Sequence, residues 1–333
     1  MADATSGVNN HAEQRQNGCA GRQTEGPAGQ VLAVLVLLLE TVWMQLRVWA
    51  EVFRGVYQTI VPPAEKSVAG EVVLVTGAGH GIGREIALKY ASLGSTVVCM
   101  DINEKGAAET VRDIKALGGA KAAAYKCDVS NRDEVLAVAK TITQEVGPVT
   151  VLVNNAGIMP TKPFLEHSAE EMKRIFDINM LAHFWLLQAF LPSMYERKHG
   201  HIVAVSSMCG QMGCTNLAPY CASKFAVRGF MESLAVEQHD LRPDMDDKVR
   251  FTTIYPYMVA TGLVKSHTVR FNGLMPILNP KVVAEEVVSA MRRNQTEISV
   301  PGWLFHFNRF VRLFPGSVAL MVRDFLQVRI SGE

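Results

Sequence analysis

The chain has 333 residues, of which 48% are hydrophobic and 20% are charged, and its formal net charge is +1. This length accommodates one large α/β domain of roughly 250 residues with appendages, and leaves no comfortable room for two enzyme domains. The near-neutral charge argues against a broad basic surface, so no nucleic-acid partner is expected. The six cysteines include no CxxC pair and follow neither a zinc-ligand spacing nor a disulfide framework, so reduced thiols and no metal site are predicted.

Two segments of opposite character precede the first predicted strand. Residues 1–29 are polar and rich in Gly, Gln, Asn and Ala, and they are predicted to form a disordered tail. Residues 30–62 begin with an aliphatic run and continue as an amphipathic pattern, which predicts a membrane-anchoring or interfacial helix ending at Pro62 and Pro63. The aliphatic side chains favour insertion by about 3 to 6 kcal/mol, whereas Glu40 opposes it by about 3 kcal/mol. Spanning the bilayer and lying on its surface both stay open, and packing on the protein's own core is the alternative to membrane attachment.

From Glu71 to about Ile254 the chain alternates between β-type and helical segments. The predicted strands are VVLVTG, TVVCMD, AAAYKCD, VLVNNAG, HIVAVSS and FTTIYP. Alternation at this spacing implies right-handed βαβ crossovers, and hence an α/β fold with a Rossmann-like, doubly wound parallel sheet. A helix that starts at Asn279 and Pro280, followed by the short strand EISVP, completes a single catalytic domain over residues 68–301.

Residues 302–333 interleave aromatic and aliphatic side chains with four arginines. Such a mixture is typical of an amphipathic segment at a membrane interface. A dimer element or a lid over the substrate explains the same pattern equally well.

The motif TGAGHGIG follows the first predicted strand and precedes a helix. Glycines allow the backbone to approach a pyrophosphate closely, and the helix N-terminus offers free N–H groups to it. The motif supplies the candidate cofactor-binding residues Gly77, His80, Gly81, Ile82 and Gly83. Its spacing differs from the usual GxGxxG, so a plain strand-to-helix turn is the alternative.

Asp101 ends the next predicted strand, about twenty residues after the glycine motif. A carboxylate at this place accepts hydrogen bonds from the adenosine ribose hydroxyls and repels a 2′-phosphate. The sequence therefore favours NAD over NADP. Capping of the following helix is the alternative role of Asp101, and it is compatible with the first.

Tyr220 and Lys224 are four residues apart, which places them on one face of a helix. A phenol has a reference pKa of about 10, too high for a good base near neutrality. An ammonium about 4 Å away is worth at most about 4 kcal/mol at an effective dielectric of 20, and lowers that pKa. The pair is thus a candidate base for an alcohol proton, although YxxxK alone is more often a surface helix pair.

Six motifs in this order resemble the short-chain dehydrogenase/reductase superfamily. They are TGAGHGIG, Asp101, NNAG at Asn154 to Gly157, Asn179, Ser207, and Tyr220 with Lys224. The resemblance covers about Val68 to Thr261. It implies that Asn179, Ser207, Tyr220 and Lys224 are catalytic, with Ser207 holding the substrate oxygen and Asn179 anchoring a water that relays protons to Lys224. It further implies that the cofactor contacts Asp128, Val129, Asn155, Pro256 and Thr261, as well as Tyr220 and Lys224.

Further segments narrow the resemblance. AHFW, HGHIV, YCASKF and MPILNPK are similar to the epidermal retinol dehydrogenase branch, near retinol dehydrogenase ten and the lipid-droplet 17-beta-hydroxysteroid dehydrogenases eleven and thirteen. One departure from the superfamily is Tyr257, where a glycine usually follows Pro256. The resemblance implies an NAD-dependent enzyme that acts on a lipophilic alcohol, with retinol as the first candidate substrate and a hydroxysteroid as the second.

A homodimer is expected, and the same resemblance implies a location at the endoplasmic reticulum membrane or the lipid droplet. The catalytic domain is expected to face the cytosol, because Arg47, Arg54 and Lys66 flank the helix on the catalytic side, although Arg15 and Arg22 on the other side oppose this. A catalytically idle membrane or lipid-droplet scaffold is the competing hypothesis. Two other features are interpreted as structural: His183 is expected to pack inside a helix layer, and the acidic run from Asp244 to Asp247 is expected to be a solvated loop.

Overall fold

The computed structural model describes residues 26–118, 121–262, 267–268, 270, 273, 275–327 and 329–330. Residues 1–25 of the expected polar tail lie outside the described residues. The chain divides into two units, Met1–Pro63 and Ala64–Glu333.

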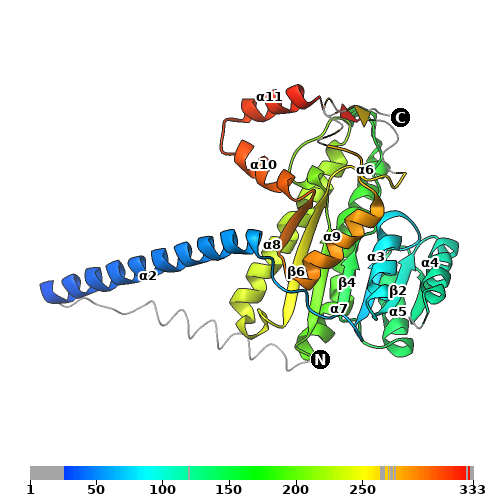
Figure 1. Ribbon diagram of the computed structural model, residues 1–333, viewed down its shortest axis with the longest axis horizontal. Helices are drawn as coiled ribbons and strands as arrows, with labels where there is room; N and C mark the ends of the chain where they lie inside the picture. The colour runs from blue at the N-terminus through cyan, green and yellow to red at the C-terminus, as the bar shows by residue number, and fades with distance from the viewer. Residues whose placement is uncertain are drawn as a thin grey trace. The chain divides into compact units, whose positions relative to one another are not determined.

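The described part of the first unit is dominated by helix α2 (Pro27–Ile60), drawn in blue in Figure 1. It begins at Pro27, inside the segment expected to be tail, because proline suits the first helical position. None of its residues is buried. Its 34 residues give the helix a length of about 51 Å. The hydrocarbon core of a bilayer is only about 30 Å thick. The helix is long and apolar enough to cross a membrane.

A second run of helix passes the same test of length and composition, over Ala169–Glu196. It comprises α6 (Ala169–Phe176), the π-helical turn η2 (Asp177–Leu181) and α7 (Ala182–Glu196). More than half of its apolar window is buried, so this run is a core element of the second unit.

The second unit is built on a seven-stranded parallel sheet in the order β3-β2-β1-β4-β5-β6-β8 (Figure 1). The strands are β1 (Val72–Thr76), β2 (Thr96–Asp101), β3 (Ala122–Lys126), β4 (Val151–Asn154), β5 (Gly200–Val205), β6 (Val249–Pro256) and β8 (Glu297–Val300). All seven predicted strands are confirmed. Several end one to three residues earlier than their motifs, because the chain leaves the sheet there to form loops.

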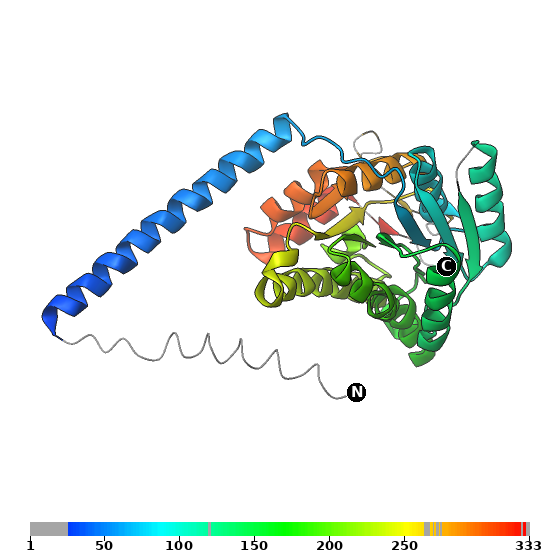
Figure 2. The same ribbon diagram turned by 90° about the horizontal axis from the view of Figure 1, so that it is seen from below.

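Helices cover both faces of this sheet, as Figure 2 shows. One face packs against α3 (Gly81–Ser92), α4 (Glu104–Ala116) and α9 (Pro280–Arg292). The other packs against α5 (Arg132–Glu145), α7 and α8 (Ala218–Leu241). Short turns η1 (Phe164–Glu166), η3 (Met208–Gly210) and η4 (Pro243–Met245) lie between these elements. The expected doubly wound α/β fold is confirmed, and Asn279 caps α9 as predicted through a hydrogen bond from Lys281 N.

The order of the strands determines where a site forms. The chain runs outward from β1 to β3 and then returns to place β4 beside the other edge of β1. Such a switch point opens a crevice beyond the carboxyl ends of the strands. Thr76 joins β1 to β4 there, because its Oγ1 accepts hydrogen bonds from Asn155 N (3.0 Å) and Ala156 N (3.1 Å).

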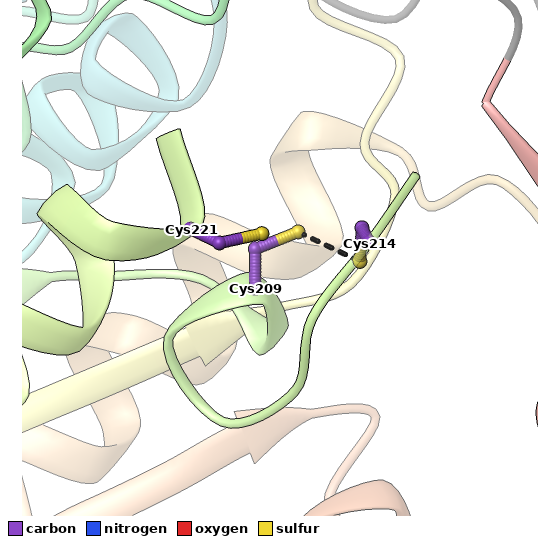
Figure 3. A group of neighbouring side chains, drawn as sticks. All are labelled: Cys209, Cys214 and Cys221. Atoms are coloured by element: carbon purple, nitrogen blue, oxygen red, sulfur yellow. Dashed lines mark hydrogen bonds between the residues drawn. The ribbon is translucent and has the colours of Figure 1, made fainter. Parts of the chain in front are cut away.

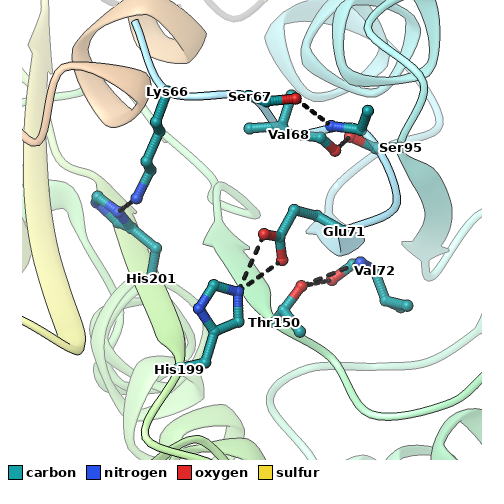
Figure 4. Close-up of polar contacts among 10 residues, drawn as sticks. Lys66, Ser67, Val68, Glu71, Val72, Ser95, Thr150, His199 and His201 are labelled. Atoms are coloured by element: carbon teal, nitrogen blue, oxygen red, sulfur yellow. Dashed lines mark hydrogen bonds and ion pairs between the residues drawn. The ribbon is translucent and has the colours of Figure 1, made fainter.

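Polar contacts attach the segment before β1, which includes Lys66 and Glu71, to β5 and the turn before it (Figure 4). Lys66 Nζ lies 3.0 Å from His201 Nδ1, and His201 Nε2 lies 2.8 Å from Thr252 Oγ1. Burial, followed by the charge of Lys66, lowers the pKa of His201, so the ring is neutral, accepting from Lys66 and donating to Thr252. Glu71 pairs with His199 at 3.0 Å. The second unit therefore needs its residues from Ala64 onward.

The C-terminal segment forms α10 (Trp303–Val311), α11 (Gly316–Leu326) and a small antiparallel pair, β7 (His267–Thr268) with β9 (Arg329–Ile330). Phe305 of α10 stacks on Tyr255 with ring centroids 5.6 Å apart, which seats the helix beyond the ends of β6 and β8. Several large apolar side chains of this segment stay exposed, among them Phe310, Leu313 and Met321.

Candidate active site

A cavity of about 320 Å³ lies at the carboxyl ends of β1, β2, β4, β5 and β6. Its lining is largely apolar. Thirteen of the sequence-predicted residues line it: Gly77, His80, Gly81, Ile82, Asp101, Asp128, Val129, Asn155, Ser207, Tyr220, Lys224, Pro256 and Thr261. The two remaining predicted residues, Gly83 and Asn179, lie behind this lining and support it.

The glycine loop needs its glycines for two different reasons. Gly77 has φ +66°, a conformation that L side chains rarely adopt. A Cβ on Gly83 would stand 2.2 Å from the carbonyl oxygen of Gly77, so any side chain there would displace the loop. Gly83 therefore sets how closely α3 approaches β1.

The N-terminus of α3 is open toward the cavity. His80 is its N-cap residue, but the His80 side chain makes no capping hydrogen bond. The next residues, Gly81 and Ile82, line the cavity. Free N–H groups and the positive end of the helix dipole at a glycine-rich turn are suited to a pyrophosphate. These residues therefore fit a dinucleotide.

Asp101 is held by two backbone hydrogen bonds at the edge of the cavity. Its Oδ2 accepts a hydrogen bond from Gly79 N (2.7 Å) and its Oδ1 one from Asn103 N (2.8 Å). Asp101 as a whole is only 5% exposed, and it still lines the cavity. A carboxylate has about four acceptor positions, so two remain for ribose hydroxyls. Asn103, rather than Asp101, caps α4 by accepting from Gly106 N.

Ser207, Tyr220 and Lys224 converge from β5 and α8. Ser207 follows the end of β5, and its Oγ accepts a hydrogen bond from Cys209 N (3.1 Å). Tyr220 and Lys224 lie in the first two turns of α8, with Lys224 Nζ 5.8 Å from the centroid of the Tyr220 ring. Lys224 Nζ donates to the carbonyl oxygen of Val205 at 3.0 Å. All three side chains are buried.

The pKa direction of Tyr220 differs from the sequence expectation. Burial raises the pKa of Tyr220, and a hydrogen bond from Ser207 partly opposes this. Burial lowers the pKa of Lys224 to about 8. The expected lowering of the phenol pKa by Lys224 is absent, because desolvation disfavours both charged forms and the ammonium is held at Val205.

Asn179 lies in the π-helical turn η2 and is fully buried. Its Oδ1 accepts from Ile158 N (2.8 Å), and its Nδ2 donates to Ile158 O (3.0 Å) and Ser223 Oγ (3.1 Å). A Cβ on Gly157 would come 3.2 Å from Asn179 Oδ1 and 3.5 Å from Lys224 Nζ. Gly157 thus keeps the space between these two polar groups open.

Asn155 and Asp128 also have structural contacts. Asn155 Nδ2 donates to Thr76 O (2.9 Å), which joins the ends of β4 and β1. Asp128 Oδ1 accepts from Ser130 N (3.0 Å) and Ser130 Oγ (2.6 Å), which shapes the turn after β3. Both residues nevertheless line the cavity.

Sequence reasoning missed part of the lining. Met159 and the cysteines Cys209 and Cys214 contribute to the cavity, and Arg323 reaches it from α11. No local pattern links Arg323 to the glycine loop, since more than two hundred residues separate them. Met208, Met212 and Tyr257 also line the cavity, whereas Leu217 is fully buried in the neighbouring core.

The two features interpreted as structural behave so in the described residues. His183 is buried, and burial lowers its pKa to about 3, so it is neutral. Each acid of the run pairs with its own neighbour: Asp244 with Lys198, Asp246 with His239, and Asp247 with Lys248.

Comparisons with known proteins agree with this architecture. The family model for short chain dehydrogenase matches residues 71–270. The chain is 40% identical over 270 residues to human epidermal retinol dehydrogenase 2, covering 81% of this chain and 86% of that protein. It is 38% identical over 285 residues to human 17-beta-hydroxysteroid dehydrogenase 13, covering 86% of this chain and 90% of that one.

Solved structures of similar fold hold either nucleotide. A short-chain dehydrogenase/reductase from Burkholderia phymatum in complex with NAD superposes with a TM-score of 0.66 at 28% identity, covering 74% of this chain and 94% of that chain. A metagenomic short-chain oxidoreductase in complex with NADP superposes with a TM-score of 0.58 at 31% identity, covering 70% and 97%. With its matched family model, its sheet and its relatives, this chain belongs to the short-chain dehydrogenase family of oxidoreductases.

Proposed function

We propose that this protein is an NAD-dependent dehydrogenase that interconverts a lipophilic alcohol and its carbonyl compound, with retinol as the first candidate substrate. The observation that carries the proposal is the convergence of Ser207, Tyr220 and Lys224 on one apolar cavity beside the glycine loop. A hydroxysteroid is the second candidate, because one close relative is named a 17-beta-hydroxysteroid dehydrogenase.

The nucleotide would be held by groups along the switch point. The open N-terminus of α3 would take the pyrophosphate, and Asp101 would accept the ribose hydroxyls. Asp128 and Val129 would border the adenine, and Thr261 and Pro256 would border the nicotinamide end. The bound nucleotide supplies the hydride acceptor for alcohol oxidation.

The proton chemistry belongs to the chain's own side chains. Ser207 Oγ would hold the substrate oxygen by a hydrogen bond, and Tyr220 Oη would take the hydroxyl proton. For this step burial must be outweighed by nearby positive charge, and Lys224 is the cation available beside the ring. We further propose that Asn179 and Lys224 pass the proton onward through the space that Gly157 leaves.

The substrate class follows from the lining. Met159, Met208, Met212 and Met258 surround the cavity, and thioether side chains adapt to irregular apolar molecules. An alcohol with a large hydrocarbon body buries more of this surface than a sugar or a hydroxy acid does.

A substrate panel tests the proposal. Full-length protein in purified membranes is assayed with retinol, estradiol and a long-chain fatty alcohol, each with NAD and with NADP. We expect NAD-dependent turnover of at least one alcohol, with retinol preferred. Tyr220→Phe membranes, matched for protein amount, serve as the blank. Nucleotide binding without turnover of any alcohol would favour the idle scaffold instead.

We propose that α2 anchors the protein to the endoplasmic reticulum membrane or a lipid droplet, with the catalytic domain, residues 68–301, on the cytosolic side. The exposed apolar surface of α2 supports attachment. Residues 302–333 are proposed as a second amphipathic contact, because Phe310, Leu313 and Phe314 are exposed beside Arg309.

We also propose a homodimer. An apolar cleft between α7 and α8 is lined by Phe184, Leu187, Leu191, Phe230 and Leu234. Burying this cleft against a second copy would remove apolar surface from water. Crosslinking of the detergent-solubilised protein, with Leu234→Glu as the disrupting variant, tests this assembly.

A further inference from the structure

Three cysteines outside the proposed machinery meet beside it. Cys209 comes from η3, Cys214 from the loop that follows and Cys221 from α8, and their sulfurs all lie within 4.8 Å of one another. Figure 3 shows the sulfurs of Cys209 and Cys221 side by side, with Cys214 completing the group. Cys209 Sγ and Cys214 Sγ are 3.2 Å apart. Cys209 and Cys221 are buried, Cys214 is partly buried, and all three are free thiols.

We propose that these three thiols form a binding site for a thiophilic divalent cation, with zinc as the physiological ion. A zinc–sulfur bond is about 2.3 Å long, so two sulfurs on one tetrahedral zinc stand about 3.8 Å apart. That separation lies between the 3.2 Å of the Cys209–Cys214 pair and the 4.8 Å limit of the group. Small side-chain rotations would bring three sulfurs onto one ion.

Binding forms three sulfur–metal bonds, and the thiols release up to three protons to solvent. No electrons are transferred. Three thiolates on a divalent ion leave a net charge of −1, and Lys224 and Arg323, which line the same cavity as Cys209 and Cys214, provide positive charge to offset it. Because Cys209 and Cys214 line the cavity, water from the cavity would supply the fourth ligand of a tetrahedral ion.

The number of thiols favours a metal over a disulfide. A disulfide uses two sulfurs and leaves the third unused, whereas a cation uses all three. A thiol-reducing compartment, such as the cytosol, also keeps cysteines available as metal ligands.

An ion at this site would couple to Ser207 and Tyr220. Cys209 N donates to Ser207 Oγ at 3.1 Å, and Cys221 directly follows Tyr220. Tying these cysteines together would hold Ser207 and Tyr220 in one arrangement and obstruct the cavity, so the ion is expected to inhibit turnover. The metal site itself stands apart from the proposed function, and only the inhibition rests on it.

Cadmium is the probe, because its thiolate complexes absorb in the ultraviolet. Full-length, reduced protein in detergent is titrated with Cd²⁺ alone, with no alcohol present. We expect one equivalent to produce the thiolate absorption, Zn²⁺ to compete for the site, and Mg²⁺, a hard cation, to have no effect. Absence of the absorption in the wild-type protein at one equivalent would overturn the proposal, whatever the variants do.

Variants locate the site. Cys214→Ser changes the most accessible of the three thiols. Loss of a residue that only supports a metal ligand lowers metal affinity by about 10- to 100-fold. We expect loss of the ligand Cys214 itself to weaken Cd²⁺ binding by at least as much. Two matched controls should bind as the wild type does: Cys19→Ser, outside the described residues, and Cys99→Ala, whose thiol lies in the core with its pKa raised by burial to about 12. Unchanged binding in Cys214→Ser contradicts the site.

Two further results separate the competing explanations. Inhibition by Zn²⁺ should be reversed by a chelator. Loss of two thiols without bound metal, reversed only by a reductant, would instead show a disulfide and overturn the proposal. Because Cd²⁺ absorption is measured without substrate, a protein that binds Cd²⁺ but turns over no alcohol contradicts the proposed function and leaves the metal site standing.

Discussion

Lys224 Nζ lies 5.8 Å from the centroid of the Tyr220 ring because its ammonium is hydrogen-bonded to the carbonyl oxygen of Val205 at 3.0 Å. The ammonium is thus held at the end of β5, although Lys224 itself lies one turn after Tyr220 in α8. Lys224 is therefore positioned by the strand end as well as by its own helix, and not by Tyr220 alone.

Removing the phenol oxygen tests the proposed base. Tyr220→Phe is expected to lower kcat by at least about 100-fold, the usual scale of general acid–base catalysis, while NADH binding changes by no more than a few-fold. Steady-state kinetics and NADH fluorescence titration measure the two effects. Tyr90→Phe is the matched control, because the Tyr90 hydroxyl is buried with no partner among the described residues. Turnover near the wild-type value in Tyr220→Phe would refute the assignment.

The charge of Lys224 should appear in the pH dependence of stability. Burial lowers the pKa of Lys224 in the folded protein to about 8 from 10.5. The unfolded chain therefore binds more protons between these pH values, and folding is stabilised as pH rises from 8 to 10.5. The difference between the folded and unfolded pKa values of Lys224 corresponds to a destabilisation of roughly 3 kcal/mol, which is fully present below pH 8.

Lys224→Met removes this titration and replaces the ammonium-bearing chain with an unbranched apolar side chain that is one atom shorter. Denaturant unfolding of both proteins at pH 7.5 and 9.5 is the measurement, and comparison with Lys224→Met cancels the titration of other groups. The variant's free energy of unfolding, relative to that of the wild type, should fall as pH rises. A pH-independent difference would show that the Lys224 pKa is not lowered.

Asp101 is expected to select the nucleotide. Asp101→Ala should narrow the preference for NAD over NADP by about 10- to 100-fold, since hydrogen bonds to a charged group contribute about 1.5 to 3 kcal/mol. Asp101→Arg should narrow it further or reverse it. The values of kcat/KM with both nucleotides measure this preference, and Glu109→Gln, at an exposed ion pair with Arg112, is the control. A wild-type preference for NADP would contradict the role given to Asp101.

Tyr257 replaces the usual glycine and lines the cavity, where its hydroxyl has no partner among the described residues. Tyr257→Gly removes a ring from the substrate side and is expected to lower kcat/KM for retinol by about tenfold through lost apolar contact. Tyr257→Phe keeps the ring and should stay within about twofold for such an apolar substrate. If Tyr257→Phe falls as far as Tyr257→Gly, the hydroxyl, rather than the ring, contacts the substrate.

Membrane attachment is expected to depend on α2. A chain that starts at Ala64 keeps Glu65 and Lys66, which bind Arg292 and His201, and should lose most membrane association while staying folded. Residues 31–60 fused to a soluble reporter should gain it. Carbonate extraction and protease protection of both termini distinguish spanning from surface binding. Full-length protein that stays soluble at low and high salt would contradict the membrane assignment.

The sequence alone determined the features that depend on neighbouring residues. Strand and helix periods predicted the parallel sheet, and glycines after the first strand predicted a turn that a Cβ on Gly83 would block. Asp101 was predicted from its place at the end of the second strand and Ser207 from the family resemblance. Both line the cavity, because the carboxyl ends of parallel strands share one edge of the sheet. The i, i+4 spacing likewise put Tyr220 and Lys224 on one face of α8.

Only the tertiary structure decided what depends on distance across the fold and on burial. The cysteine group forms because η3, a loop and α8 meet, and Arg323 reaches the cavity because α11 packs near it. Desolvation reversed the pKa direction expected for Tyr220. A sequence pattern determines which residues share a face of one helix or strand. The contacts of the cysteine group and of Arg323, and the low dielectric around Tyr220, arise instead from how separate elements pack together.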